Sequence, residues 1–256
     1  MAAVTGGALK PVAAIGAGLW LTARAGSGLA RRLWRGESLA QRQLADSLPV
    51  HVWRPLRTLL PLAALAGIIA GIGAARLLAL YNAQIPVLTA LADVLLRDVV
   101  PLLVGLFACG SVSVALAARL GAMGLAREID ALEALGRDPA AHALGPALGA
   151  VLLSAPIHMC LAGLAAIIGC GLPLGLIANV GWPLWTSFAL SHDAAQAMLT
   201  GMGKLLLYAL IAFVIGSAVG AKPARAPADI GRRAITAFTA GLLGIFTAAA
   251  LWTALA

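Results

Sequence analysis

Charged residues are scarce in this chain. Asp, Glu, Lys and Arg together make up 11% of its 256 residues, against about a quarter in ordinary soluble domains. Hydrophobic residues make up 61% of the chain, and its mean hydropathy is +0.96. A soluble domain of this length could not hide that much apolar surface in one core. The composition therefore excludes an ordinary soluble domain and predicts a protein embedded in lipid.

Aromatic residues and cysteines are also few. Aromatic residues make up only 5% of the chain, although its net charge is +8. Proteins that bind single-stranded nucleic acid combine basic grooves with aromatic side chains that stack on the bases, so no nucleic-acid partner is expected. The three cysteines, Cys109, Cys160 and Cys170, lie in apolar runs and form no C-x-x-C pair. They are interpreted as small buried hydrophobes rather than as disulfide or metal-binding residues.

No motif for catalysis or nucleotide binding is found. The four histidines, at 51, 142, 158 and 192, are scattered without the spacing of metal ligands. The segment Gly201-Met-Gly203-Lys204 lacks the first glycine and the closing hydroxyl of a phosphate-binding loop. A membrane enzyme acting on lipids would need acids or histidines clustered at one membrane depth, and the sequence offers no such cluster. We therefore expect a non-catalytic protein without a metal or cofactor.

Long apolar segments recur along the chain. A helix needs about 20 apolar residues to cross about 30 Å of hydrocarbon. Five segments are predicted as spans, of which the fourth is somewhat shorter than this length: 59–80, 99–118, 143–170, 204–221 and 234–255. After residue 170, Gly171, Pro173 and Gly175 predict an irregular connection, and Trp182 and Trp185 are expected to anchor it at the membrane interface. The predicted fold class is an all-α integral membrane protein, with residues 1–256 as one domain.

Basic residues predict the orientation of these spans. Segments 1–58, 119–142 and 221–233 hold 15 of the 18 Lys and Arg residues, and with five spans all three segments lie on one side. The positive-inside rule makes that side cytoplasmic, so the N-terminus is cytoplasmic and the C-terminus lies across the membrane. In the N-terminal region, 8–57, an arginine cluster directly follows a short apolar stretch. We interpret this region as an amphipathic helix on the cytoplasmic interface rather than a signal peptide.

Small residues recur four positions apart, a spacing that lets helix backbones approach closely. Packing within the chain is the favoured interpretation over a dedicated dimer motif. The pairs are Gly67/Gly71, Gly145/Gly149, Gly171/Gly175 and Gly216/Gly220.

The segment 121–139, between the second and third spans, predicts a short amphipathic helix. Ile129, Leu132 and Leu135 form an apolar stripe among charged neighbours. Gly136 is a plausible C-cap and Pro139 a stop. Two interpretations remain open, namely a surface helix resting on the bilayer and a docking helix for a soluble partner.

This segment resembles the signature region of the MlaE (YrbE) permeases, the membrane subunits of ABC transporters that move phospholipid between Gram-negative membranes. Upstream, Arg97-Asp98-Val99-Val100-Pro101 resembles the family's Arg-Glu-Leu-Gly-Pro. The chain differs from the family at Ser111, where Arg is usual, and at Arg119, where Glu is usual. The matching residues are Leu120-Gly121, Met123, Glu128-Ile129-Asp130-Ala131-Leu132, Gly136, Asp138-Pro139 and Pro146.

The resemblance implies a permease subunit that moves phospholipid or a related lipid between the inner membrane and a periplasmic MCE-domain partner, which helps to maintain outer-membrane lipid asymmetry. It also implies a separate ABC ATPase subunit, a second permease copy in a homodimer or paralogue heterodimer, and a periplasmic C-terminus. A membrane scaffold and a divergent paralogue for another hydrophobic substrate remain as alternatives.

The resemblance also implies two sets of functional residues. The first would line a lipid pocket and consists of Ala70, Leu77, Tyr81, Arg97 and Asp98, the last two forming a polar pair. The alternative for this pair is that both side chains reach water at a helix end. The second set would couple the permease to the ATPase and consists of Glu128, Ile129, Asp130, Leu132 and Leu135.

Overall fold

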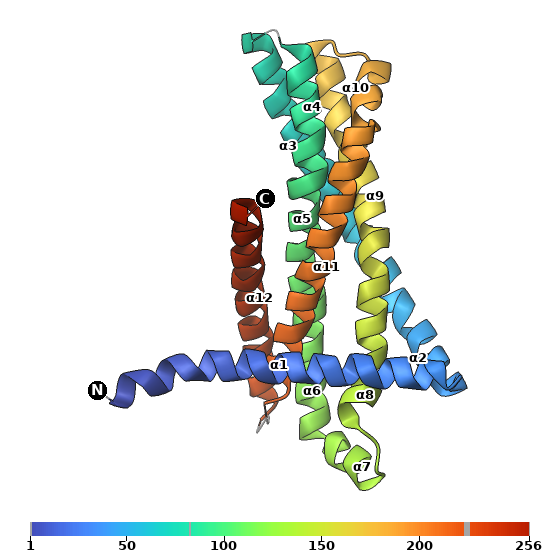
Figure 1. Ribbon diagram of the computed structural model, residues 1–256, viewed down its shortest axis with the longest axis vertical. Coiled ribbons are helices and arrows are strands. Elements are labelled where there is room, and N and C mark those ends of the chain that lie inside the picture. The colour runs from blue at the N-terminus through green and yellow to red at the C-terminus, as the bar shows by residue number, and fades with distance from the viewer. Residues whose placement is uncertain (1, 82, 223–225, 256) are drawn as a thin grey trace. The chain divides into compact units, whose positions relative to one another are not determined.

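The computed structural model describes residues 2–81, 83–222 and 226–255, and within these ranges every regular element is helical (Figure 1). Three π-helical turns, labelled η, interrupt the α-helices. The order is α1 Ala2–Trp34, α2 Ser38–Leu48, η1 Pro49–Trp53, α3 Arg54–Tyr81, α4 Gln84–Val94, η2 Leu95–Val99, α5 Val100–Ala108, η3 Cys109–Ser113, α6 Val114–Leu125, α7 Glu128–Ala134, α8 Pro139–Ala143, α9 Gly145–Ala178, α10 Trp182–Ala189, α11 His192–Gly220 and α12 Pro227–Leu255.

Five stretches of the described chain are long and apolar enough to cross a membrane, which confirms the predicted number of spans. Each continuous stretch is longer than the segment that the sequence predicts. In the second stretch the added length includes Asp93, Arg97 and Asp98, whose charges are paired. The stretches are Ser38–Tyr81, Gln84–Leu125, Gly145–Ala178, His192–Gly220 and Pro227–Leu255.

The third span does not end at residue 170, so the expected irregular connection there is wrong. Helix α9 continues through Pro173 to Ala178, because neighbouring helices and local adjustments can satisfy the backbone groups that a proline frees in a membrane helix. Gly171 is explained by packing, since a Cβ at this position would overlap the Trp182 ring. The helix ends at Asn179, which takes a left-handed φ of +51°.

Contacts between Cα atoms divide the chain into two compact units. Unit 1 contains Met1–His51, Leu106–Ser154 and Tyr208–Ala256, and unit 2 contains Val52–Gly105 and Ala155–Leu207.

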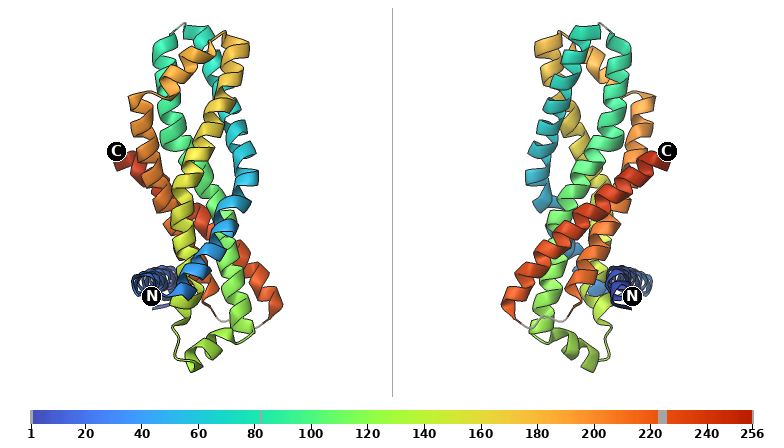
Figure 2. Two further views of the ribbon diagram at one scale, coloured as in Figure 1. Left: turned by 90° about the vertical axis from the view of Figure 1, so that its right-hand side faces the viewer. Right: turned by 90° about the vertical axis from the view of Figure 1, so that its left-hand side faces the viewer.

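In unit 1, α1 packs against α8, and α12 crosses α6 and η3 (Figures 1 and 2). A Cβ at Gly28 would overlap Ala141, so glycine lets α1 lie directly on α8. A Cβ at Gly216 would lie 2.8 Å from the Cα of Ser113, and the Ser113 hydroxyl donates to Ala212 O at 2.8 Å. Small residues and one buried hydroxyl therefore hold α11 and η3 together.

In unit 2, α3 packs on α9 through glycine. A Cβ at Gly67 would overlap the backbone of Ala166, and one at Gly71 would lie 2.5 Å from Cys170 O. This pair therefore packs within the chain, as the sequence predicts. Trp185 is fully buried and its indole N–H donates to Ile167 O at 3.0 Å. Its expected role as an interface anchor is wrong, because the ring fills the core of unit 2.

Candidate functional site

An ion pair joins Lys204 on α11 to Asp98 on η2 in unit 2. The Lys204 ammonium donates to Oδ1 of Asp98. Only 4% of the Lys204 side chain is exposed, against 42% for Asp98. A charged group within a membrane-spanning helix is costly unless it is paired, and such groups mark functional sites. The pair is therefore the strongest candidate in this unit for contact with a polar substrate group.

Local backbone geometry explains how Lys204 reaches Asp98. A Cβ at Gly201 would overlap the carbonyl oxygen of Leu96, so only glycine lets α11 lie directly on η2. Lys204 is three residues further along and lies on the same side of α11. Asp98 belongs to a π-helical turn, a local widening of the helix that is frequent at functional sites.

Arg97 and Asp98 form two separate ion pairs rather than one polar pair. The Arg97 guanidinium contacts Oδ1 of Asp93 at 2.8 Å, one helical turn earlier. Within the described residues, Nε of Arg97 is buried and has no hydrogen-bond partner. Neither residue lies at a helix end, because the helix that carries them begins at Gln84. The helix end assumed in the alternative interpretation is therefore absent here, although both side chains are about two-fifths exposed.

Ala70, Leu77 and Tyr81 share one face of α3. Their spacing of seven and four residues places them in one row along the helix. Leu77 and Tyr81 are exposed in the isolated chain, and Ala70 is half-buried. Helix α3 contacts η2, so the row and the ion pairs belong to neighbouring elements of unit 2.

Sequence analysis missed Lys204 as a candidate residue. We considered Lys204 only as part of an incomplete phosphate loop. Its partner lies 106 positions away, and no local pattern links the two. The available signal was a single lysine within an apolar run, since a lone charge in a spanning helix needs a partner.

In unit 1, the predicted coupling segment 121–139 consists of three short elements. Helix α6 ends at Leu125, α7 covers Glu128–Ala134, and α8 begins at Pro139. Arg127, with a φ of +53°, breaks the helix before α7, and Gly136, with a φ of +67°, ends it. Pro139 occupies the first turn of α8, whose N-cap Asp138 accepts a hydrogen bond from Ala140 N at 3.0 Å. Pro139 therefore opens α8, and the expectation that it stops the preceding helix is wrong, because that helix has already ended at Gly136.

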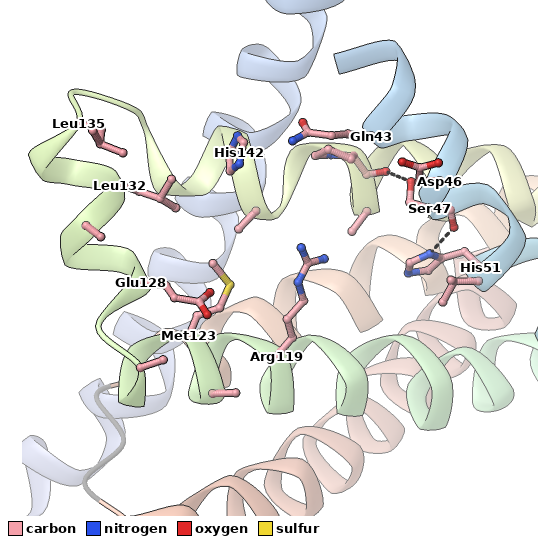
Figure 3. A pocket seen from close by; sticks show the side chains of 17 residues that line it. Gln43, Asp46, Ser47, His51, Arg119, Met123, Glu128, Leu132, Leu135 and His142 are labelled. Carbon is pink, nitrogen blue, oxygen red and sulfur yellow. Dashed lines mark hydrogen bonds between the residues drawn. The ribbon is translucent and has the colours of Figure 1, made fainter. Parts of the chain in front are cut away.

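Helix α7 lies between two hollows of unit 1. The larger, of about 950 Å³, is called the α7 pocket and is lined by residues of α2, η1, α6, α7, α8 and α9, among them Glu128, Leu132 and Leu135 (Figure 3). The smaller, of about 270 Å³, is lined by Ile129 together with Trp20 and other residues. The predicted apolar stripe is therefore split, with Leu132 and Leu135 on one side and Ile129 on the other. Asp130 is exposed and lines neither hollow.

The α7 pocket has charges of both signs. Arg119 extends from α6 toward the centre of the pocket, with His142 on the opposite wall and Glu128 beside Met123 (Figure 3). Burial lowers the pKa of His142, and the positive charges of Arg32, Arg137 and Arg119 lower it further. His142 is therefore neutral at pH 7, and Arg119 is the principal cation of this pocket.

One side-chain hydrogen bond joins α2 to α9 beside the pocket, and two further contacts lie within α2 and η1. The Ser47 hydroxyl donates to Leu44 O at 2.8 Å and lies 3.1 Å from Pro146 O. Nδ1 of His51 lies 2.9 Å from Ser47 O. Ser47, His51 and Pro146 all line the α7 pocket, so these bonds lie in its wall.

In the described ranges, no group of three or more His, Cys, Asp or Glu side chains is arranged to hold a metal ion. The arrangement instead offers ion pairs in an apolar bundle and a mixed apolar and charged pocket at a turn. The ion pairs suit the binding of a polar group. The pocket beside the short helix α7 suits contact with another protein.

Comparison with protein families matches residues 51–255 to the model described as Permease MlaE. Comparison with curated protein sequences gives no match. The family match begins within the first candidate span, Ser38–Tyr81, and extends to the end of the last, Pro227–Leu255. This chain therefore belongs to the MlaE permease family and is a multi-pass transmembrane permease of the ABC-transporter type.

Proposed function

We propose that the chain is the membrane subunit of an ABC transporter that moves phospholipid between the inner membrane and a periplasmic MCE-domain protein. The observation that carries this proposal is the Lys204–Asp98 ion pair, a built polar site within an apolar bundle of unit 2. A phospholipid combines an apolar body with a charged headgroup, and both kinds of contact are present in this unit. Family membership supports the transport role.

The lipid site in this proposal combines an apolar row with nearby charges. Ala70, Leu77 and Tyr81 contact the acyl chains, and Arg97 faces the phosphate beside the Lys204–Asp98 ion pair. Arg97 supports this role because its side chain is 43% exposed beside its Asp93 partner, and a guanidinium can bind phosphate through two parallel hydrogen bonds. Tyr81 has an exposed side chain with a polar tip, suited to the membrane interface.

The coupling element in this proposal is α7 together with the α7 pocket. Leu135 is 74% exposed, and an exposed leucine beside acidic residues suits a groove on a soluble protein. Glu128 and Asp130 stand in the first turn of α7, where the helix dipole stabilises acids. We assign Ile129 and Leu132, both half-buried, to fixing α7 against its own unit.

The partners and orientation follow from the same proposal. A separate ATPase subunit binds on the cytoplasmic side at α7, and a second permease copy, identical or paralogous, completes the lipid pocket. The N-terminus is cytoplasmic and the C-terminus periplasmic, in agreement with the positive charge of the segments between spans.

Reconstitution tests the proposed function. The chain is co-expressed with the ATPase and the MCE-domain protein encoded beside its gene and is placed in vesicles containing a fluorescent phospholipid. The proposal predicts movement of this lipid to or from the MCE-domain protein that requires ATP. A membrane scaffold would give no ATP-dependent movement, and a permease for another hydrophobic substrate would give ATP hydrolysis that phospholipid does not stimulate.

A further inference from the structure

A basic hollow of about 570 Å³ lies in unit 1 where the end of α1, the start of α2 and the segment between α7 and α8 meet. It is separate from the ion pairs of unit 2 and shares only His142 with the α7 pocket. Its volume lies within the range of small-molecule sites. The charged residues that line it are Arg31, Arg32, Arg35, Glu37, Arg137 and Asp138.

The C-terminal ends of α1 and α7 form part of the wall of the hollow and share one hydrogen-bond pattern. At the end of α1 and at the end of α7, a glycine takes a φ of +67°, namely Gly36 and Gly136. In both, the N–H of the glycine and that of the next residue donate to carbonyls three and five residues earlier, at 2.9 to 3.1 Å. This Schellman arrangement fixes the residues on either side of the glycine. Arg35 precedes Gly36 and Arg137 follows Gly136, so the backbone of both arginines is held by these hydrogen-bonded turns.

The two acids of the hollow are already paired. Glu37 accepts from Nε of Arg32 at 2.9 Å. Asp138 contacts the Arg24 guanidinium at 2.9 Å and also caps α8. Both carboxylates are therefore neutralised by these arginines and do not balance the positive charge of the other arginines in the hollow.

Three arginines of the hollow remain uncompensated. In the part of the chain that the structure describes, no carboxylate pairs with Arg31, Arg35 or Arg137. The two helix C-termini contribute about half a negative charge each, and their carbonyls are largely capped. Three positive charges outweigh about one negative charge, so the hollow attracts an anion. Burial lowers the pKa of His142 most, and the nearby charges of Arg32 and Arg137 lower it further, which agrees with a positive local field.

We propose that the basic hollow binds the phosphate of an anionic phospholipid at the membrane surface. Guanidinium groups match phosphate oxygens in pairs, and converging arginines on rigid turns suit such a group. Clusters of Lys and Arg beside membrane helices recognise anionic headgroups in the same way. This inference goes beyond the proposed transport function and depends only on the chain being a membrane protein.

The lipid is favoured as the source of the phosphate by the faces of α1. Arg24, Arg31 and Arg35, spaced seven and four residues apart, lie on one exposed face, and Ile15 and Leu19 lie exposed on another. A helix with separate apolar and basic exposed faces is built for the bilayer interface. Trp34, next to Arg35, is 94% exposed, and tryptophan prefers the headgroup region.

Native mass spectrometry of the full chain in detergent tests this site. The protein is titrated with dioleoylphosphatidylglycerol and, separately, with dioleoylphosphatidylcholine, and bound lipid is counted. The test variant is Arg35→Gln/Arg137→Gln. The control, Arg42→Gln/Arg57→Gln, removes the same charge at exposed arginines that line none of the three hollows described above. A third variant, Arg35→Lys/Arg137→Lys, retains the positive charges but lacks the planar guanidinium groups that bind two phosphate oxygens at once.

The site predicts that Arg35→Gln/Arg137→Gln weakens phosphatidylglycerol binding by about tenfold or more, because it removes two of the basic residues that attract the anionic headgroup. The lysine pair should retain intermediate binding, which separates a binding defect from a folding defect. The control should bind as wild type does. Equal binding by test variant and wild type, or an equal loss in the control, overturns the proposal. Displacement of the lipid by an equal concentration of inorganic phosphate would assign the hollow to a free anion and also overturn it.

Discussion

Lys204 and Asp98 are joined across 106 positions of sequence, and the lysine is almost fully buried while the aspartate is half-exposed. Because of this difference in exposure, the charge of Lys204 needs its partner more than the charge of Asp98 does. An unpaired ammonium at the position of Lys204 would have no access to water, whereas an unpaired carboxylate at the position of Asp98 could still be solvated. The Asp98 carboxylate thus makes the buried charge on α11 tolerable.

Charge removal should therefore cost more on one side of the pair. Asp98→Asn leaves the buried ammonium unpaired and should lower the free energy of unfolding by about 3 kcal/mol. Lys204→Met leaves a half-exposed carboxylate and should cost about 1 kcal/mol. The double variant should be more stable than Asp98→Asn alone. Thermal unfolding in detergent measures all three, and strictly additive losses would show that the two groups are not coupled.

Two glycines on α11 provide a test of its contact with η2. Gly201→Ala places a methyl group against Leu96 O and should destabilise the protein by about 1–3 kcal/mol. Gly203→Ala is the matched control, because nothing lies within 4 Å of its Cβ position. That change should be neutral or should stabilise the helix by up to about 1 kcal/mol. Melting temperatures that fall equally for both variants would contradict the close approach of these elements.

The coupling assignment predicts that Leu135→Asp weakens binding of the ATPase subunit by about tenfold or more, because a charge replaces an exposed apolar contact. Ala134→Asp is the control, since this neighbouring residue is exposed and lines neither hollow beside α7. Co-purification from membranes at matched expression measures the effect. Retention of the ATPase by Leu135→Asp, or equal loss in both variants, would remove α7 from the coupling path.

The environment of His142 predicts a pH dependence. Because its pKa in the folded protein lies below the ordinary value of 6.5, the unfolded chain binds more protons in the interval between the two values. Stability contributed by neutral His142 is therefore complete above pH 6.5 and is lost as the pH falls through the folded-state pKa. His142→Asn should show a smaller drop in melting temperature between pH 7.5 and pH 5.5 than wild type. A steeper drop in the variant would reverse the predicted sign.

The spans could be predicted from sequence because a helix is the form in which a single segment satisfies its own backbone in lipid, and apolar length reveals it. Their boundaries were harder to predict. The second span was expected to begin at 99, because Asp93, Arg97 and Asp98 interrupt the apolar run. The helix instead begins at Gln84, since Asp93 and Arg97 pair one turn apart and Asp98 pairs with Lys204.

The candidate site was only partly predictable for a related reason. The spacing of Ala70, Leu77 and Tyr81 places them on one helix face, and the helix end at Gly136 follows from the sequence. The break at Arg127 does not, because an arginine with a positive φ gives no sequence signal. Lys204 could not be assigned, because its role depends on which helix its neighbour Gly201 contacts. The separation of Ile129 from Leu132 depends in the same way on how α1 and α2 pack beside α7.

Site-directed photocrosslinking tests the central claim, a phospholipid site on one face of α3. A benzophenone amino acid is placed at Tyr81 or at Leu80 in cells whose phospholipids carry radioactive phosphorus. The two positions are adjacent and similarly exposed, at 72% and 76%, so surrounding bilayer lipid reaches both, but they lie about 100° apart around the helix. The account predicts several-fold stronger labelling at Tyr81, lost on Asp98→Asn. Equal labelling at both positions would contradict it.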